Sequence, residues 1–311
     1  MRRGKVREEN RPGDSEMTTL LGRDKPICTT CGTEYPGARN DCPICEDPRQ
    51  FVGWKGQEWT TLSAMAGKYE NKFEQDEERV FSIRSDPKFA IGQRAQVIQT
   101  AQGNLLWECV SLLDEPTAQR VNDLGGIAAI AISHPHYYAT MVEWSHAFEN
   151  IPIYLHEDCR KWVMYPEANI QFWDGETKKL FGGLTLIRTP GHFEGFQVLH
   201  SSEPGEGGHG EGEHGEARGV LFAGDQPRIC MDRQWVSFMY SYPNFIPLSA
   251  AAVRDIVQRL SEYRFDRIYG AVDGWIVPSG AEEVVKKSAE RYLRAIEMND
   301  GLNPKQLRAK G

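Results

Sequence analysis

The residues of this chain whose types and spacing could do chemistry are three histidines and one aspartate. Each follows an apolar run: they are His134 and His136 in SHPHYY, His192 in TPGHFEG, and Asp225 at the end of LFAGD. Such a run, stopped by Gly or Pro, predicts a buried strand whose following loop presents side chains. Residues i and i+2 of an extended segment point the same way, so both imidazoles of His-Pro-His can reach one ion. We therefore predict a metal centre formed by these four residues.

The donor set indicates which chemistry this centre would support. Three imidazoles and a carboxylate suit Zn, Fe(II) or Mn and leave a coordination position for water or substrate. An ion held in this way lowers the pKa of its water from about 15.7 to ~7 and polarises a carbonyl group. We expect hydrolysis of a small-molecule ester, lactone, thioester or amide, with one Zn as the cofactor and Fe or Mn as alternatives. Asp225 would act as general base if it binds the metal loosely.

The order of these ligands resembles that of the metallo-β-lactamase superfamily. The signature of that family is H-x-H-x-D-H, then G-H, then an Asp after a strand, then a late His. The resemblance covers roughly residues 60–300 and places His134, His136, His192 and Asp225 in the corresponding order. The resemblance implies a four-layer αββα sandwich, which combines α/β and α+β architecture. It also implies that the three histidines bind the first metal and that Asp225 is the residue that usually bridges two metals.

Two parts of the family signature are absent from this chain. The D-H half of the first motif falls on Tyr138 and Ala139, and no histidine follows His214. The resemblance therefore implies one metal ion, or a second that binds weakly. Asp273 in YGAVDGW is a candidate replacement for the late His, and a surface turn before glycine is the alternative. We predict that Tyr138 donates a hydrogen bond to a substrate oxyanion, with plain packing as the alternative.

A second candidate metal site lies near the N-terminus. It consists of two C-x-x-C pairs ten residues apart, formed by Cys28, Cys31, Cys42 and Cys45. Four thiolates complete a tetrahedral structural Zn and leave no position open for chemistry. The knuckles CTTCGTEY and CPIC also resemble those of rubredoxins, in which the same ligands hold iron. We predict a zinc ribbon over residues 26–50 with one structural Zn; iron and disulfide pairing are the alternatives.

An aromatic segment, WVSFMYSYPNFIPL, follows the Asp225 loop. It is broken by two prolines and lies where the resembled family places elements that face the substrate. We predict that Tyr240, Tyr242 and Asn244 line a broad apolar pocket, and that Phe238 and Phe245 pack in the interior. A core cluster is the alternative.

The remaining sequence divides the chain into regions. Residues 1–25 are polar and predict a disordered tail, and residues 51–311 form the main domain. Within that domain, residues 201–218 are rich in Gly and Glu and predict a flexible surface loop.

The periodicity of the main domain predicts strands first and helices last. Short strands are expected at VFSIR, AQVIQTA and LLWECVSLL, the last two joined by a turn. The strands IAAIAIS and PIYL then alternate with helices near residues 138–148 and 156–164. Helical spacing recurs over 248–263 and 281–298. This order suits two sheets with helices outside.

Composition restricts the function classes. A hydrophobic content of 40% supplies a core for one large domain and a small appendage, and the net charge of -8 gives no support to nucleic-acid binding. No apolar stretch approaches the ~18–20 residues that span a bilayer, and the start has no apolar signal segment. An odd count of seven cysteines, four of them in the ribbon, indicates a reducing compartment, the cytoplasm.

Three function classes remain. The first is the metal-dependent hydrolase. The second is a non-haem iron oxygenase, because two His and one carboxylate form the facial triad and some relatives in the resembled superfamily are sulfur dioxygenases. The third is a binding module that keeps the fold without catalysis, with protein contact or homo-oligomer formation through the ribbon. Retention of all four ligands together favours an enzyme.

Overall fold

The computed structural model describes residues 24–167, 169–202 and 219–300. Apart from Asp24 and Lys25, the predicted tail lies outside these residues. The predicted Gly/Glu-rich loop also lies outside them, except for Ser201 and Ser202.

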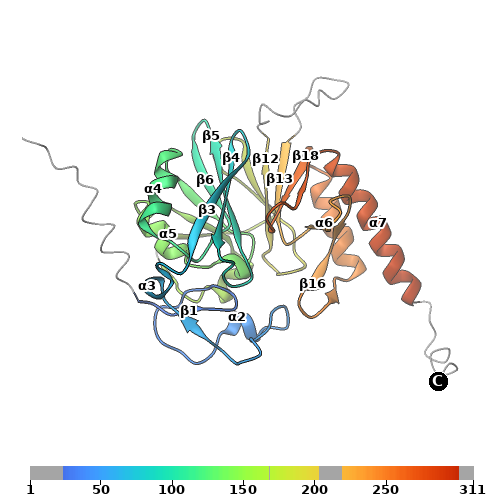
Figure 1. Cartoon of the computed structure of the whole chain (residues 1–311). Helices are drawn as coiled ribbons and strands as arrows, with labels where there is room; N and C mark the ends of the chain where they lie inside the picture. Colours follow the sequence, from blue (N-terminus) through green and yellow to red (C-terminus); the bar gives the residue numbers. More distant parts are fainter. Residues whose placement is uncertain (1–23, 168, 203–218, 301–311) are drawn as a thin grey trace, which may run out of the picture.

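Two sheets form the centre of the main domain (Figure 1). The first has seven strands in sequence order: β3 (Glu70–Glu77), β4 (Val80–Asp86), β5 (Arg94–Thr100), β6 (Gly103–Trp107), β7 (Ala129–Ala131), β8 (Ile153–His156) and β9 (Ile170–Trp173). The second has six strands in the order β10 (Thr177–Lys179), β11 (Leu184–Arg188), β12 (Gln197–Ser201), β13 (Gly219–Gly224), β18 (Phe265–Gly270) and β19 (Ile276–Val277).

Helices cover the outer face of each sheet. The first sheet carries α4 (Glu115–Asp123) and α5 (Met141–Ala147), and the second carries α6 (Ala250–Leu260) and α7 (Ala281–Asp300) (Figure 1). Apolar side chains from both sheets, including Leu105, Ala131, Leu199 and Phe222, form one buried cluster between them. The predicted αββα sandwich is confirmed.

Local sequence explains where several elements begin and end. The Asp114 side chain accepts the amide hydrogen of Thr117 and caps α4, and Ser249 caps α6 in the same way. The predicted strand LLWECVSLL ends early, at Trp107, because Glu108 adopts a left-handed backbone conformation with φ of 63°.

Two predicted helices differ from the structure. The segment predicted as a helix over 156–164 is a 3-10 helix, η2 (Glu157–Trp162). The helix predicted over 138–148 begins only at Met141, because a separate 3-10 turn, η1 (Pro135–Tyr137), precedes it. That turn carries His136, so the His-Pro-His segment is not extended throughout.

Parallel pairing determines which loops meet. Strands β6, β7 and β8 pair in parallel, as do β13 and β18. The loop that follows β7 and the loop that follows β13 therefore leave from the carboxyl ends of buried parallel strands, where function is usually presented. Two short hairpins follow β13 in the chain: β14 (Arg228–Ile229) with β15 (Val236–Ser237), and β16 (Met239–Ser241) with β17 (Ile246–Pro247).

The cysteine-rich region packs under the two sheets (Figure 1). It contains β1 (Ile27–Cys28) and α2 (Pro43–Glu46), and β1 pairs with β2 (Trp59–Thr60). A one-turn helix, α3 (Leu62–Met65), leads into the main domain. The β1–β2 pairing brings residues 59–60 into the ribbon, beyond its predicted end at residue 50.

Hydrogen bonds and an ion pair join the ribbon to the main domain. The Lys25 ammonium lies 2.6 Å from the buried carboxylate of Glu143. The Glu34 amide donates to the Ala139 carbonyl at 2.9 Å, and the Ser111 hydroxyl donates to the Gly32 carbonyl at 2.8 Å. The ribbon is therefore fixed to the domain at several points.

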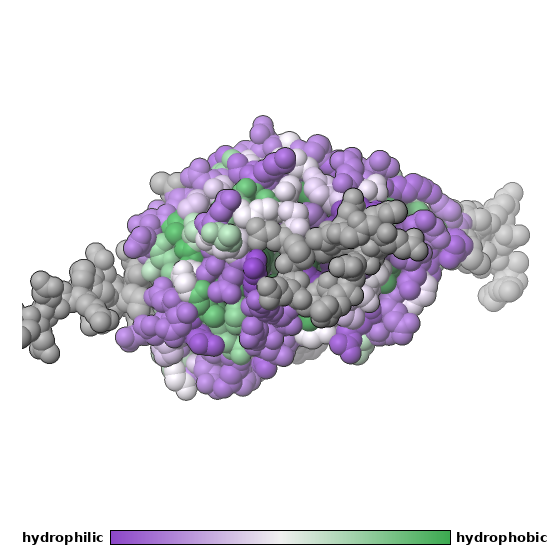
Figure 2. Space-filling view, turned by 90° about the horizontal axis from the view of Figure 1, so that it is seen from above, coloured by the Kyte–Doolittle hydropathy of each residue, from purple (hydrophilic) through white to green (hydrophobic). Residues whose placement is uncertain are grey.

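The end of the molecule opposite the ribbon is mostly hydrophilic, with small separate hydrophobic areas (Figure 2). Within the described ranges, no helix combines the length and the apolar character that crossing a membrane requires.

We predict that Gly32→Ala destabilises the protein. Gly32 has φ of 77°, and a Cβ at this position would overlap the Ser111 hydroxyl oxygen. The backbone strain and the steric overlap should together lower the free energy of unfolding by about 1–3 kcal/mol. Gly37→Ala is the control, because a Cβ there meets nothing within 4 Å. Urea unfolding of both variants tests this; equal midpoints would contradict the close packing of the knuckle.

Candidate metal centres

The structure brings the predicted His and Asp residues together. His134 follows β7, His136 lies in η1, His192 follows β11 and Asp225 follows β13. One ligand atom from each lies within 4.8 Å of the others. His136 Nδ1 is 3.4 Å from His192 Nε2, and His134 Nε2 is 3.5 Å from Asp225 Oδ2. We call these four residues the His/Asp cluster.

The spacing of these atoms fits a bound metal ion. Zn–N bonds of about 2.0–2.1 Å in a tetrahedron place two ligand nitrogens roughly 3.3–3.4 Å apart. The Nε2 atom of His134 is buried and has no hydrogen-bond partner among the described residues. A buried polar atom without a partner is costly, and a metal ion at the cluster would satisfy it.

Burial keeps the imidazoles neutral, which is the form that binds metal. Desolvation lowers the pKa of His192 to about 3 and moves the pKa of His134 and His136 below the usual range. For His136, the neighbouring imidazoles add to this effect. The nitrogen lone pairs therefore remain available at neutral pH.

Hydrogen bonds to the opposite ring nitrogens fix which atom faces the cluster. His192 Nδ1 lies 2.8 Å from the Tyr240 carbonyl oxygen, and His134 Nδ1 lies 2.7 Å from the Ser133 hydroxyl. Because a carbonyl only accepts, Nδ1 of His192 carries the hydrogen and Nε2 is the atom left available to a metal ion.

Glu108 forms hydrogen bonds with Ser133, the residue before His134. Its carboxyl accepts the Ser133 amide hydrogen at 3.0 Å and the Ser133 hydroxyl hydrogen. Full burial raises the pKa of Glu108 to about 8 despite these hydrogen bonds. Its contact with Ser133 depends on the left-handed turn that ends β6.

Arg228 occupies the other side of Asp225. Its Nη1 lies 2.7 Å from Asp225 Oδ1, while Asp225 Oδ2 faces the histidines. Burial acts to raise the pKa of Asp225, but the Arg228 guanidinium and the imidazoles outweigh it and hold that pKa below its usual range. The guanidinium also lies over the Tyr242 ring at 4.4 Å.

The three predicted pocket residues have different positions. The Tyr240 carbonyl contacts His192, and the Tyr242 hydroxyl donates to the Asp225 carbonyl at 2.7 Å. The Asn244 side-chain amide instead donates hydrogen bonds of 2.9 Å to the carbonyls of Pro48 and Gln50 in the ribbon region. The contacts of Asn244 thus join the β16–β17 hairpin to the ribbon.

The two predicted packing residues nearby also differ. Phe238 is fully buried, as expected. The prediction for Phe245 is wrong, because its side chain lies at the tip of the β16–β17 hairpin and is 83% exposed. A tight turn at this tip, with Phe245 at φ of 56°, directs the ring to solvent.

Tyr138 and Asp273 lie outside the described His/Asp cluster. Tyr138 is buried in the core beside α5, and burial with the neighbouring Cys159 thiol raises its pKa. Its adjacent residue, Tyr137, instead packs on the His134 ring at 5.2 Å. Asp273 pairs with Arg84 at 3.0 Å on the surface. The catalytic role of Tyr138 stays a prediction.

Several residues that contact the cluster or its loops belong to no sequence motif, so the sequence did not predict their positions. Arg228 stands three residues after Asp225, a spacing that suits an ion pair but is common in any chain. Gln93 and Arg49 contact the His loops from far away in sequence, and no motif marks them.

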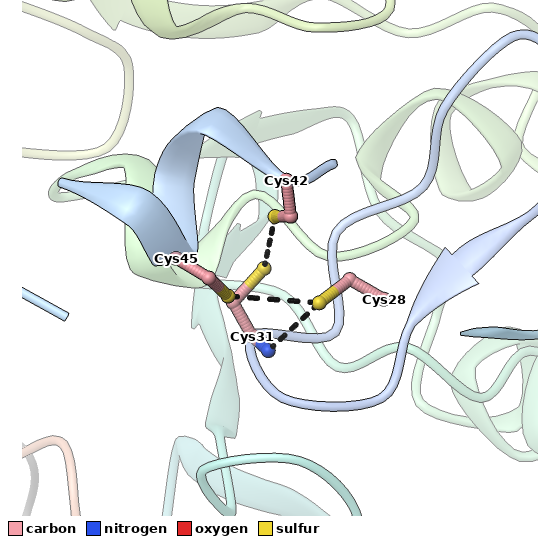
Figure 3. Close-up of side chains that lie close together, drawn as sticks. All are labelled: Cys28, Cys31, Cys42 and Cys45. Atoms are coloured by element: carbon pink, nitrogen blue, oxygen red, sulfur yellow. Dashed lines mark hydrogen bonds between the residues drawn. The ribbon is translucent and has the colours of Figure 1, made fainter. Parts of the chain in front are cut away.

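The four predicted ribbon cysteines also converge (Figure 3). The Cys28–Cys45 and Cys31–Cys42 sulfur atoms are each 3.6 Å apart. A tetrahedral Zn with bonds of ~2.3 Å separates its sulfurs by about 3.8 Å, so the arrangement suits zinc. The Gln57 amide lies 3.2 Å from Cys28 Sγ and can stabilise a thiolate there. None of the seven cysteines, all within the described ranges, forms a disulfide.

Comparison with solved structures concerns the fold. The crystal structure of VMB-1 superposes with a TM-score of 0.52 at 14% identity, over 73% of this chain and 98% of VMB-1. DIM-1 metallo-beta-lactamase superposes with a TM-score of 0.49 at 16% identity, over 71% of this chain and 98% of DIM-1. At these identities the likeness concerns the fold. The likeness to VMB-1 and the four layers give the chain a metallo-β-lactamase fold, with a four-cysteine cluster consistent with a zinc ribbon.

A much closer relative defines the family. "Uncharacterized protein YmaE" of Bacillus subtilis (strain 168) is 46% identical over 275 residues, which cover 87% of this chain and 96% of YmaE. The chain belongs to the same family as YmaE. No protein-family model matches it.

We predict that the contribution of Glu108 to the free energy of unfolding falls as pH rises toward 8. Its folded pKa of about 8 lies above the ordinary 4.5, so the folded state holds a proton that the unfolded state loses between these values. The resulting loss is at most about 1.4 kcal/mol per pH unit.

Glu108→Gln should flatten this slope. The measurement is urea unfolding of zinc-loaded protein at pH 5.5, 6.5 and 7.5, with exposed Glu290→Gln as the control that keeps the wild-type slope. Parallel slopes for wild type and Glu108→Gln would show that Glu108 is already ionised in the folded protein.

Proposed function

We propose that this protein is a metal-dependent hydrolase that uses one Zn ion at the His/Asp cluster to act on a small carbonyl compound, an ester, lactone, thioester or amide. The observation that carries the proposal is the convergence of four buried ligand atoms, three of them on neutral imidazoles. A buried cluster of this kind is costly without an ion, and an ion would satisfy it.

The surroundings of Asp225 support a single ion at this site. One carboxylate oxygen faces the histidines and the other is bonded to Arg228. The guanidinium thus supplies a fixed positive charge beside Asp225, where a second ion would need the same oxygen. Asp273, the candidate substitute ligand, is instead paired with Arg84.

The chemistry follows from the residues that hold the ion. When bound, Zn supplies Lewis acidity, which activates water near neutral pH and polarises a carbonyl. His134 and His192 are held by hydrogen bonds that direct Nε2 inward, so the site is preorganised. Arg228 keeps Asp225 ionised and oriented. If Asp225 binds the metal loosely, its carboxylate would accept the proton of the attacking water.

The aromatic rings near Asp225 favour an organic substrate. The rings of Tyr242 and Trp275 lie 4.4 and 5.2 Å from the Arg228 guanidinium, which contacts Asp225. Aromatic rings beside one cation suit a small molecule that combines apolar and polar groups.

We also propose that the ribbon side contacts another protein chain. Trp54 and Phe245 are 102% and 83% exposed, and the Asn244 hydrogen bonds bring their two segments together. Exposed aromatic residues in one area are typical of contact surfaces. The free thiols suit a reducing location, and we propose the cytoplasm.

We predict about two Zn per wild-type chain and one in the His134→Ala/His192→Ala variant. The double substitution removes two of four ligands from the His/Asp cluster and leaves the cysteines intact. Elemental analysis after exhaustive dialysis measures both proteins. His200→Ala is the control, since its ring bonds the Arg264 carbonyl away from the cluster, and it should retain two Zn.

Other metal contents would change the conclusion. One Zn in wild type and variant alike would mean that the His/Asp cluster holds no ion and would refute the hydrolase proposal. Iron lost in the variant would point to the oxygenase alternative and to a screen for oxygen uptake.

A further inference from the structure

Gln93 lies between the two candidate metal sites. Its side chain is buried, with 4% of the residue exposed, just before β5. The side-chain amide Nε2 donates one hydrogen bond to the Cys31 carbonyl at 2.6 Å and one to the His136 carbonyl at 3.0 Å. One amide group thus contacts the backbone of a ligand residue in each site.

The amide hydrogens match this pair of acceptors. The NH2 group of glutamine carries two donors, which is the number needed for two carbonyls. The His136 carbonyl belongs to η1, the short turn that presents the His136 ring, and the Cys31 carbonyl belongs to the first cysteine knuckle. Fixing both peptide groups fixes the position of one site relative to the other.

Further contacts brace the same two segments. The Glu34 amide, three residues after Cys31, donates to the Ala139 carbonyl, three residues after His136. The Ser111 hydroxyl binds the Gly32 carbonyl on the knuckle itself. The knuckle and the His136 turn therefore lie against each other along their length.

Arg49 forms a second link, from the ribbon to His192. It follows the second cysteine pair and is buried, and its guanidinium pairs with Asp47 at 2.6 Å. Its Nη1 atom lies 3.3 Å from the His192 carbonyl, and its guanidinium lies 3.9 Å from the centre of the Phe193 ring. The loops of two of the four ligands are thus held by contacts with the ribbon side.

We propose that the two sites are energetically coupled, with Gln93 as the positioning residue, so that metal bound by the four cysteines strengthens metal binding at the His/Asp cluster. In a structural zinc site the free energy of metal binding is also free energy of folding, so metal bound by the cysteines increases the order of the knuckle. An ordered knuckle holds the Gln93 amide and, through it, the His136 turn. By linkage the effect is reciprocal. The inference rests on the proposed function in taking the His/Asp cluster as a metal site.

Gln93→Ala tests the link while leaving all eight ligands in place. It removes both hydrogen bonds and leaves two buried carbonyls unpaired. We expect affinity at the His/Asp cluster to fall about tenfold to hundredfold, the range for residues that orient ligands. The control is Gln99→Ala. It removes a hydrogen bond of 2.7 Å that the Gln99 side-chain amide donates to the Leu124 carbonyl, away from both sites.

The probe is Co(II), titrated against a competing chelator. Thiolate ligands give an intense charge-transfer absorption that the His/Asp cluster lacks, so the two sites are read separately. Weaker binding at the His/Asp cluster in Gln93→Ala, with Gln99→Ala unchanged, supports the proposal. Equal His/Asp affinities in wild type and Gln93→Ala overturn it. Wild type that binds Co(II) only at the thiolates overturns the hydrolase proposal as well.

A second comparison measures the coupling itself. The Cys42→Ser substitution weakens metal binding by the four cysteines. It is introduced both into the wild-type protein and into the Gln93→Ala variant. We expect Cys42→Ser to weaken His/Asp binding about tenfold in wild type and clearly less in Gln93→Ala. The same effect in both backgrounds would overturn the role of Gln93. If Cys42→Ser does not fold, as far-ultraviolet circular dichroism would show, the Gln93→Ala titration alone decides.

Discussion

The structure depends on the burial of three imidazoles and one carboxylate at a single point between two sheets. Removing such groups from water is unfavourable unless each finds a partner. The Tyr240 carbonyl, the Ser133 hydroxyl and the Arg228 guanidinium supply partners on the outer side of the cluster. The inner atoms face one another, and an ion is the partner that would satisfy them together. The loops around the cluster are arranged to meet this constraint.

The same constraint explains why the ribbon packs where it does. The loops that carry His136 and His192 are short and irregular, and isolated loops of this kind are mobile. The Gln93 amide, which also contacts the first cysteine knuckle, holds the His136 carbonyl, and Arg49 of the ribbon holds the His192 carbonyl. The Glu34–Ala139 hydrogen bond adds a third support. The cysteine site thus contributes to the order of a site with which it shares no ligand.

Arg228 compensates the charge of Asp225. Asp225 is buried, and a buried carboxylate with a single neighbouring ion would keep one oxygen uncompensated. The guanidinium supplies that compensation at 2.7 Å and lies over the Tyr242 ring. A fixed side-chain charge is not exchanged with solvent, so the proposed centre would hold its charge balance with a single bound ion.

Local patterns in the sequence were enough to predict the two candidate ligand sets, from His-Pro-His after an apolar run and from two C-x-x-C pairs, and apolar periodicity predicted the order of strands and helices. The four-layer class came from the resemblance of the ligand order to the metallo-β-lactamase superfamily, because periodicity does not distinguish this sandwich from other layered α/β folds. Only the tertiary structure decided what surrounds the ligands. Gln93, Arg49 and Glu108 act through backbone or side-chain contacts with residues distant in sequence, and a single glutamine, arginine or glutamate carries no pattern. Phe245 was misassigned because hydrophobicity predicts burial, whereas the direction of a hairpin tip is set by how the chain folds around it.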